Sequence, residues 1–179
     1  MTTFATRDTA HLRRVLGAFP TGVTVIAALV QGGPVGMAVS SFTSVSLEPP
    51  MVLACINRAS TTWPVLAPAP MFGVSVLAAD QQRACRQLSA RGGDRFADLA
   101  WHTTSHGAVL LDGVAAWLEC STEDVHAAGD HDIVVLRVHD LGQGPSVPPL
   151  VFHRSAFRHL APQGSAGREG LVPDGDMAL

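Results

Sequence analysis

Three short stretches of this sequence carry polar side chains at a spacing that could bind a ligand. The longest, GMAVSSFTSVSLEPP at residues 36–50, places five hydroxyl side chains among small apolar residues and ends at two prolines. Serine and threonine beside paired prolines are common in solvated turns, so a purely structural role is one interpretation. The other is an extended segment whose small side chains let a planar polar ligand approach backbone N–H groups and hydroxyls.

The other two stretches have the same dual character. NRAST at 57–61 offers an arginine, two hydroxyls and open backbone N–H groups to a phosphate, although Asn57 and Ser60 could instead cap a following helix. Gly129, Asp130 and His131 place a group that titrates near neutral pH directly after two common turn residues. Ligand binding and turn formation therefore both stay open for each stretch.

Several familiar catalytic signatures are missing. The chain has no GxGxxG, GxxxxGK[ST], HExxH or GxSxG sequence, so no Rossmann unit, P-loop, zincin or nucleophile elbow is predicted. Of the eight histidines, His102 and His106 are four residues apart in a strand-and-loop region, where that spacing does not bring side chains together. We predict no metal site, and we interpret His153 and His159 as surface or hydrogen-bonded histidines.

Composition narrows the class of protein. The 179 residues are 47% hydrophobic, which suits one globular domain with a sizeable core. A net charge of -3 with only 12 Lys plus Arg excludes nucleic acid and an anionic membrane as the main partner. Three widely separated cysteines give neither a disulfide framework nor a CxxC motif and are expected to be small buried hydrophobes. With no signal sequence and no apolar run of about 20 residues, a cytoplasmic location is expected.

Two helices are predicted. Asp8 can cap a helix that ends at Pro20, and the spacing of its apolar residues predicts that one face packs inward; these residues are Leu12, Val15, Leu16 and Phe19. A second helix is expected over residues 80–90, beginning at an Asp80 cap and burying Ala84, Cys85 and Leu88.

The rest of the chain predicts six or seven strands. QGGP at 31–34 indicates a hairpin, and two long strands within 108–142 are joined near 126–131. Such close spacing without a βαβ alternation favours an antiparallel barrel or sandwich. The tail from Ala161 is expected to be disordered or laid on a partner subunit. The other strand segments are 22–30, 34–41, 51–57, 71–77 and 149–160.

Three segments, in this order and at this spacing, resemble one family. FPTGVTVIAA, GMAVSSFTSVSLEPPMVLACINRAST and AAGDHDIVVLRV are similar to the short-chain flavin reductases, the reductase components of two-component flavin-dependent monooxygenases. The resemblance covers about 12–160. It implies a mainly β fold with a few helices, an antiparallel, Greek-key-like FMN-binding split β-barrel that forms a homodimer with flavin at the subunit interface. It divides the chain into a reductase-like domain, 1–160, and a flexible tail, 161–179.

The resemblance also implies a flavin site. Residues 37–41 would follow the flavin ring, 55–57 would form the neighbouring wall, and 58–61 would meet the phosphate. A flat apolar ring with a hydrogen-bonding rim needs small residues where backbone approaches, such as Gly36, and donors at the rim. The implied flavin-binding residues are Met37, Ala38, Val39, Ser40, Ser41, Ser46, Cys55, Ile56, Asn57, Arg58, Ser60 and Thr61.

The implied reaction is hydride transfer from NADH to FMN or FAD, with reduced flavin released to a partner monooxygenase. His131 is the candidate catalytic residue, placed to orient the nicotinamide or touch the flavin rim. Further nicotinamide or adenine contacts are predicted at Phe96, Phe152 and Arg154, with Arg95 beside the first. The chain has no tyrosine, whereas relatives often carry an aromatic pair in the last strand. No arginine cluster suits a 2′-phosphate, which favours NADH over NADPH.

Two other functions stay open. A non-catalytic flavin-binding protein would keep the same flavin contacts without a route for the nicotinamide. An oxidase resembling the pyridoxamine-phosphate oxidases would share the barrel, although the Gly-Asp-His sequence argues against it. A dimer is also expected on physical grounds, because a chain with only 15% charged residues would expose apolar surface that a second copy could cover.

Overall fold

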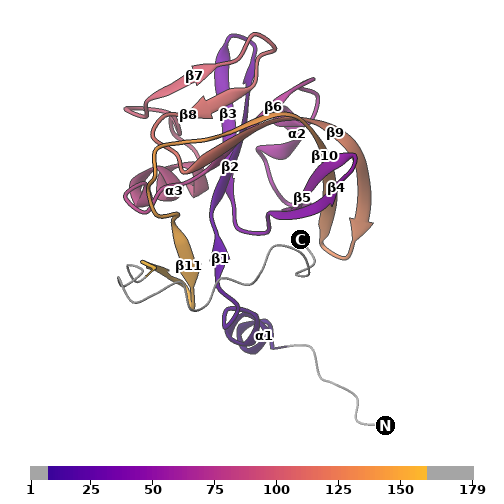
Figure 1. Ribbon diagram of the computed structural model, residues 1–179. Helices are drawn as coiled ribbons and strands as arrows, with labels where there is room; N and C mark the ends of the chain where they lie inside the picture. Colours follow the sequence, from indigo (N-terminus) through magenta and orange to yellow (C-terminus); the bar gives the residue numbers. More distant parts are fainter. Residues whose placement is uncertain (1–7, 161–179) are drawn as a thin grey trace.

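A seven-stranded antiparallel sheet forms the body of the protein (Figure 1). The computed structural model describes residues 8–160. The strand order is β3-β2-β6-β9-β10-β5-β4. These strands are β2 (Thr24–Val30), β3 (Gly33–Val39), β4 (Thr43–Leu47), β5 (Pro50–Asn57), β6 (Phe72–Val76), β9 (Ala116–Ala128) and β10 (His131–Gln143).

Two hairpins in this sheet begin at the turns that the sequence predicts. Gln31 and Gly32 adopt positive φ between β2 and β3, and Gly129 does so between β9 and β10. Glycine tolerates this conformation because it has no Cβ. The long strand β10 pairs with β9 on one side and with β5 on the other, which brings His131 opposite Asn57. The mainly β, antiparallel prediction is therefore confirmed.

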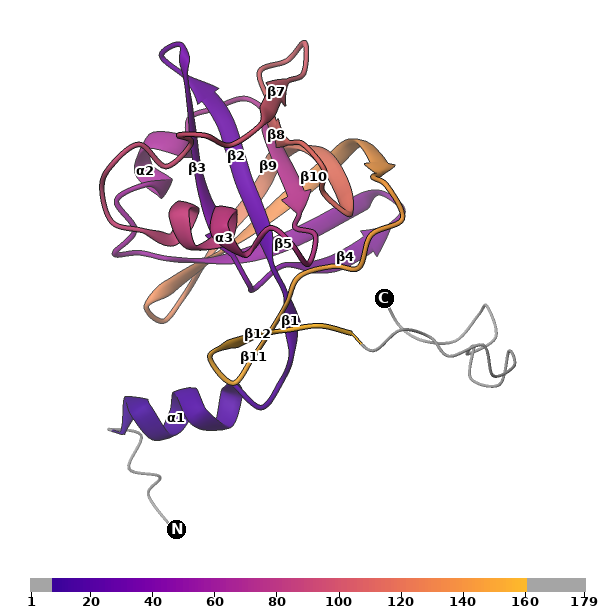
Figure 2. The same ribbon diagram turned by 90° about the vertical axis from the view of Figure 1, so that its left-hand side faces the viewer.

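Smaller elements surround the main sheet. Figure 2 shows α1 below the sheet, with β1 leading up from it and the β11–β12 hairpin alongside. Helix α3 packs beside β3. The bounds are α1 (Thr9–Leu16), β1 (Thr21–Gly22), α2 (Trp63–Leu66), α3 (Gln82–Ser89), β7 (Trp101–Thr103), β8 (Val109–Leu111), β11 (Val151–His153) and β12 (Ala156–Arg158).

Side chains of β2 are buried on both faces of the sheet. Ile26 belongs to one apolar cluster, with β5, β6 and β10, whereas Val25 belongs to a second cluster under α3. Helix α3 closes the second cluster with Ala84, Cys85 and Leu88, as its spacing predicts. Because β3 lies at the edge of both clusters, its outer side is left for a ligand.

The sequence predicts six or seven strands, whereas residues 8–160 form twelve. The hydroxyl-rich residues Thr43–Leu47 form strand β4, an exposed edge strand paired with β5, and not a loop. Threonine and valine pack well on a half-exposed pleated surface, so serine and threonine content alone could not separate edge strand from turn. The short pair β7–β8 was also missed, because strands of three residues carry no measurable alternation.

Both predicted helices form, each with one error. Asp8 caps α1 by accepting a hydrogen bond from the backbone N–H of His11, as predicted, but no residue of α1 is buried. The expectation of an inward-packed face was therefore wrong for a single chain. Asp80 does not cap α3, which begins at Gln82 after Gln81. The Gln81 side chain instead accepts from the N–H of Ala78.

Residues 8–160 show neither a membrane-spanning helix nor a candidate metal cluster. None of the helices there has the length and apolar character to span a lipid bilayer. Nor does that part of the chain gather three or more His, Cys, Asp or Glu side chains in a geometry that could hold a metal ion. The predicted tail, 161–179, lies outside the described residues.

Candidate functional site

Two pockets lie along the outer side of β3. The first, which we call the aromatic pocket, has a volume of about 320 Å³. It is lined by Val23, Ala38, Val39, Ser40, Cys85, Arg86, Ser89, Phe152 and Phe157. The second, the Arg95 pocket, has a volume of about 340 Å³. It is lined by Pro34, Val35, Gly36, Thr61, Thr62, Val65, Gly92, Gly93, Asp94, Arg95 and Phe96.

The aromatic pocket is walled by the β11–β12 hairpin. Phe152 and Phe157 meet edge to face, with ring centroids 5.6 Å apart, a favourable arrangement for two aromatic side chains. The hairpin is tied to the end of α1, where the N–H of Arg154 donates to the carbonyl of Gly17 and His153 Nε2 lies 3.1 Å from the carbonyl oxygen of Ala18. The pocket thus presents a fixed aromatic wall to β3.

The Arg95 pocket has the chemistry of an anion site. Arg95 Nη1 donates to Thr62 Oγ1 at 2.6 Å and lies 3.5 Å from the carbonyl oxygen of Gly36. Gly92 and Gly93 both have positive φ, so no side chain stands between their backbone and the pocket. A half-buried guanidinium beside hydroxyls and open backbone suits a phosphate group.

Gly36 separates the two pockets. A Cβ at this position would stand 2.7 Å from the Ala27 Cβ and 3.0 Å from Phe96 Cζ. Only glycine therefore fits here without displacing β2 or Phe96. Gly36 is itself buried, so its missing side chain makes room for β2 and Phe96 to pack against β3.

Ser40 and Ser41 have different environments. Ser40 is exposed and lines the aromatic pocket. The Ser41 hydroxyl donates to the carbonyl of Cys55 and accepts from the N–H of Cys55, both at 2.9 Å. Ser41 thus joins the end of β3 to β5, while Ser40 is the hydroxyl presented to the pocket.

Residues 57–60 make the capping contacts that the sequence left open. The Asn57 side chain accepts from the N–H of Ala59, and the Ser60 hydroxyl accepts from the N–H groups of Thr62 and Trp63 at the start of α2. Arg58 is held by Asp132 at 2.7 Å. None of these three predicted flavin ligands lines either pocket, whereas their neighbour Thr61 lines the Arg95 pocket.

His131 lies near the same residues, opposite Asn57 in the pairing of β10 with β5. Its Nδ1 lies 2.8 Å from Asp130 Oδ1, and this contact holds the pKa of Asp130 below its usual value. His131 pairs with Asn57 across β10 and β5, and it lines neither of the two pockets. In one chain, the structure therefore separates the candidate catalytic histidine from the aromatic pocket.

The other predicted residues fall into two sets, those outside the pockets and those that line them. Met37 packs against the apolar cluster that contains Ile26, and the Ile56 side chain is fully buried in that cluster, so Ile56 could offer a ligand only its backbone. Cys55 is half-buried beside Ser41, Ser46 lies on edge strand β4, and Arg154 is exposed outside the aromatic pocket. The pockets bring together the remaining predicted residues, which are Ala38, Val39, Ser40 and Phe152 in one and Thr61, Arg95 and Phe96 in the other.

Sequence reasoning missed the part of the site that comes from α3 and β12. Arg86 and Ser89 follow the buried Cys85 on α3, and Phe157 faces Phe152 across the hairpin. No local signal distinguishes Arg86, because polar residues are usual on the exposed face of an amphipathic helix. Two of the three cysteines are buried: burial raises the pKa of the Cys120 thiol to about 12, and burial also raises that of Cys85.

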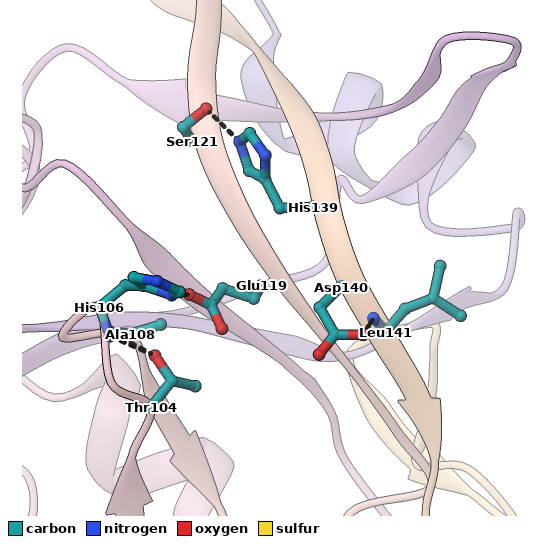
Figure 3. Close-up of polar contacts among 8 residues, drawn as sticks. All are labelled: Thr104, His106, Ala108, Glu119, Ser121, His139, Asp140 and Leu141. Atoms are coloured by element: carbon teal, nitrogen blue, oxygen red, sulfur yellow. Dashed lines mark hydrogen bonds and ion pairs between the residues drawn. The ribbon is translucent and has the colours of Figure 1, made fainter.

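A third pocket, of about 460 Å³, lies beside β9 and β10, and none of its residues was a predicted ligand (Figure 3). There the buried Glu119 carboxylate lies 2.8 Å from His106 Nδ1, and Ser121 Oγ lies 2.8 Å from His139 Nε2. The first contact holds the turn between β7 and β8 against β9. His102 pairs with Asp112 instead, so the two histidines do not act together, as predicted.

Comparisons with known proteins identify the family of this chain. The model of the flavin reductase like domain matches residues 16–161. The reductase subunit HsaB of a flavin-dependent monooxygenase from Rhodococcus jostii is 39% identical over 87% of this chain and 80% of its own length. FMN reductase (NADH) SmoA from Agrobacterium fabrum is 40% identical over 87% of this chain and 88% of its own.

A solved structure of a flavin reductase is also similar to this chain. The NADH:FAD oxidoreductase SgcE6 of Streptomyces globisporus, in complex with NAD and FAD fragments, superposes with a TM-score of 0.83 at 39% identity. The match covers 88% of this chain and 95% of that one. With a family model over most of its length and relatives near 40% identity, the chain belongs to the flavin reductase like domain family.

Proposed function

We propose that this chain is an NADH-dependent flavin reductase that reduces FMN or FAD and supplies reduced flavin to a partner monooxygenase. The observation that carries the proposal is the pair of pockets on one strand, with a phosphate-type lining at one end of β3 and an aromatic lining at the other. From Gly36 to Ser40 an extended strand covers about 13 Å. That span is comparable with the distance from a flavin ring to its phosphate.

The residues present fit a flavin. Arg95, Thr61 and Thr62 would hold the phosphate, while Ala38 and Val39 would face the flat ring, with Ser40 at its rim. When bound, a flavin supplies a two-electron acceptor. The protein need only hold the donor and acceptor in contact and keep water away, because the cofactors carry the chemistry.

The aromatic wall is the proposed platform for the nicotinamide. Phe152 and Phe157 form it, one from each strand of the β11–β12 hairpin. NADH is the proposed donor, because SmoA and SgcE6 are both named for NADH. His131 remains the proposed catalytic residue, but since it lines neither pocket in one chain, this role requires a second copy to bring it to the nicotinamide.

A split barrel and a homodimer belong to the same proposal. In support of barrel closure, β3 contacts β5 and Ser41 joins the two. In support of a dimer, Leu16 and Phe19 are 65% and 75% exposed at the end of α1. A cluster of exposed apolar side chains is more often a protein–protein interface than a surface that stays in contact with solvent. The monooxygenase partner is proposed because HsaB is a reductase subunit of such an enzyme. The cytoplasmic location stays a prediction.

Steady-state oxidation of NADH with added FMN, FAD or riboflavin tests the function. We expect turnover with at least one flavin, and bound flavin with negligible turnover would favour the non-catalytic alternative. Peroxide formed from an amine substrate without NADH would favour the oxidase.

Arg95→Gln tests the orientation of the flavin. Because a charge-assisted contact to phosphate contributes about 1.5–3 kcal/mol, the KM for FMN should rise about tenfold or more, while the KM for riboflavin, which has no phosphate, should change little. Arg91→Gln, an exposed arginine in the same loop, is the matched control. An equal loss with FMN and riboflavin would contradict a phosphate role.

A further inference from the structure

Arg86 is the one charged residue in the lining of the aromatic pocket. Its guanidinium carbon stands 5.3 Å from the centroid of the Phe157 ring. Within residues 8–160 it makes no ion pair with a carboxylate, whereas Arg83 on the same helix pairs with Asp98 at 3.2 Å. A cation–π contact positions a guanidinium without neutralising it. Arg86 is therefore an exposed guanidinium without a carboxylate partner that lines the aromatic pocket together with Ser40 and Phe152.

The reaction creates a negative charge in the flavin. A hydride, one proton with two electrons, leaves C4 of NADH as its C–H bond breaks, and it forms the N–H bond at flavin N5. NADH is thereby oxidised to NAD⁺. The flavin gains two electrons and one proton, so a ring that began neutral becomes an anion, with its charge spread over the N1 and O2 edge. A cation near the ring thus interacts more strongly with product than with oxidised flavin.

We propose that Arg86 is the electrostatic partner of this anion and raises the affinity of the site for reduced flavin relative to its affinity for oxidised flavin. The inference rests on the proposed function, which puts the ring in the aromatic pocket. Two observations favour the ring over other anions. The phosphate has its own site at Arg95, at the other end of β3. The aromatic pocket is otherwise lined by apolar and hydroxyl side chains, so Arg86 faces a mostly uncharged ligand surface.

Phe157 and Arg86 act as one unit in this proposal. The ring of Phe157 lies under the guanidinium, and its edge-to-face contact with Phe152 fixes the ring in turn. The charge is therefore held over the pocket by a side chain that cannot compete with the flavin for it. A carboxylate in the place of Phe157 would fix the guanidinium equally well but cancel its charge.

The test measures binding of FMN in its two redox states. Under anaerobic conditions, the dissociation constants of oxidised and dithionite-reduced FMN, and the midpoint potential of bound FMN, are compared in wild type, Arg86→Gln, Arg86→Lys and the control Arg83→Gln. In Arg86→Gln we expect the dissociation constant of reduced FMN to rise about tenfold while that of oxidised FMN changes less than about twofold. A tenfold change in that ratio corresponds to a lowering of the two-electron potential by about 30 mV. Arg86→Lys should restore part of the difference.

Several results would overturn the inference. An unchanged ratio of the two constants in Arg86→Gln would do so, as would an equal change in Arg83→Gln, which would indicate a general effect of surface charge. A rise in the KM for NADH with no change of potential would assign Arg86 to the dinucleotide diphosphate instead. The proposed function fails separately, and this inference with it, if the wild type neither binds FMN nor oxidises NADH in its presence.

Discussion

Gly36 sets the geometry of the site at the scale of one residue. Its missing side chain makes room for Ala27 of β2 and for Phe96, which lines the Arg95 pocket. Glycine in a strand interior costs conformational entropy, so its presence marks a close approach. Here that approach comes from the neighbouring strand and from the Phe96 ring.

Gly36→Ala should therefore affect both stability and binding. We expect a loss of about 1–3 kcal/mol in the free energy of unfolding, because the new methyl overpacks against Ala27 and Phe96, and weaker FMN binding. Urea unfolding and FMN titration measure the two effects. Gly33→Ala, where a Cβ would meet nothing within 4 Å, is the control and should change neither. Equal effects at the two glycines would exclude the packing explanation.

Sequence reasoning identified residues better than it identified their partners. It singled out Ala38, Ser40 and Phe152, and the structure brings these three together in one pocket. It could not separate Ser40 from Ser41, because the two serines differ only in which way each points at the end of β3. Nor could it find Arg86, whose role depends on packing of α3 against a hairpin some seventy residues away in sequence.

At the scale of elements, Ser41 is the link that positions β3. The Ser41 hydroxyl bonds to both the N–H and the carbonyl of Cys55. It therefore takes the place of a pair of backbone ladder hydrogen bonds between the end of β3 and β5. A backbone N–H that loses its partner costs more than a typical hydrogen bond contributes. The end of β3, and with it Ser40, depends on this contact.

Ser41→Ala should lower the free energy of unfolding by about 1–2 kcal/mol. Ser44→Ala, an exposed serine on β4, should stay within about 0.5 kcal/mol of wild type. Chemical denaturation of the two variants measures the difference. A loss of FMN affinity in Ser41→Ala without any loss of stability would instead make the hydroxyl a direct flavin ligand, as the family resemblance implies.

The elements themselves could be predicted where their periodicity is long. Strand β2, the β2–β3 turn and the buried face of α3 follow from a β-branched apolar run, glycine and helical spacing. The apolar face of α1 also follows from spacing, but spacing does not say what the face packs against. Helix capping at Asp8 is a local interaction and was predicted correctly, whereas Asp80 does not cap α3, which begins at Gln82 and has no side-chain cap at Gln81.

At the scale of the whole molecule, the apolar face of α1 is left uncovered in a single chain. An amphipathic helix gains most of its stability from packing of its apolar face, yet Val15 and Leu16 are 55% and 65% exposed. The helix nevertheless has a fixed position, since the β11–β12 hairpin bonds to the carbonyls of Gly17 and Ala18 just after it. The same hairpin walls the aromatic pocket. A second copy that covers α1 would therefore also brace the proposed nicotinamide platform.

Val15→Glu tests this connection. A charge on the apolar face should dissociate the proposed dimer, because burying an unpaired carboxylate costs several kcal/mol, and sedimentation velocity would detect the monomer. Turnover of NADH should fall with the dimer, since His131 reaches the nicotinamide in this proposal only from a second copy. Ala10→Glu adds the same charge outside that face and should leave a dimer. A wild-type chain that sediments as a monomer and still oxidises NADH at full rate would contradict both the interface and the role of the partner's histidine.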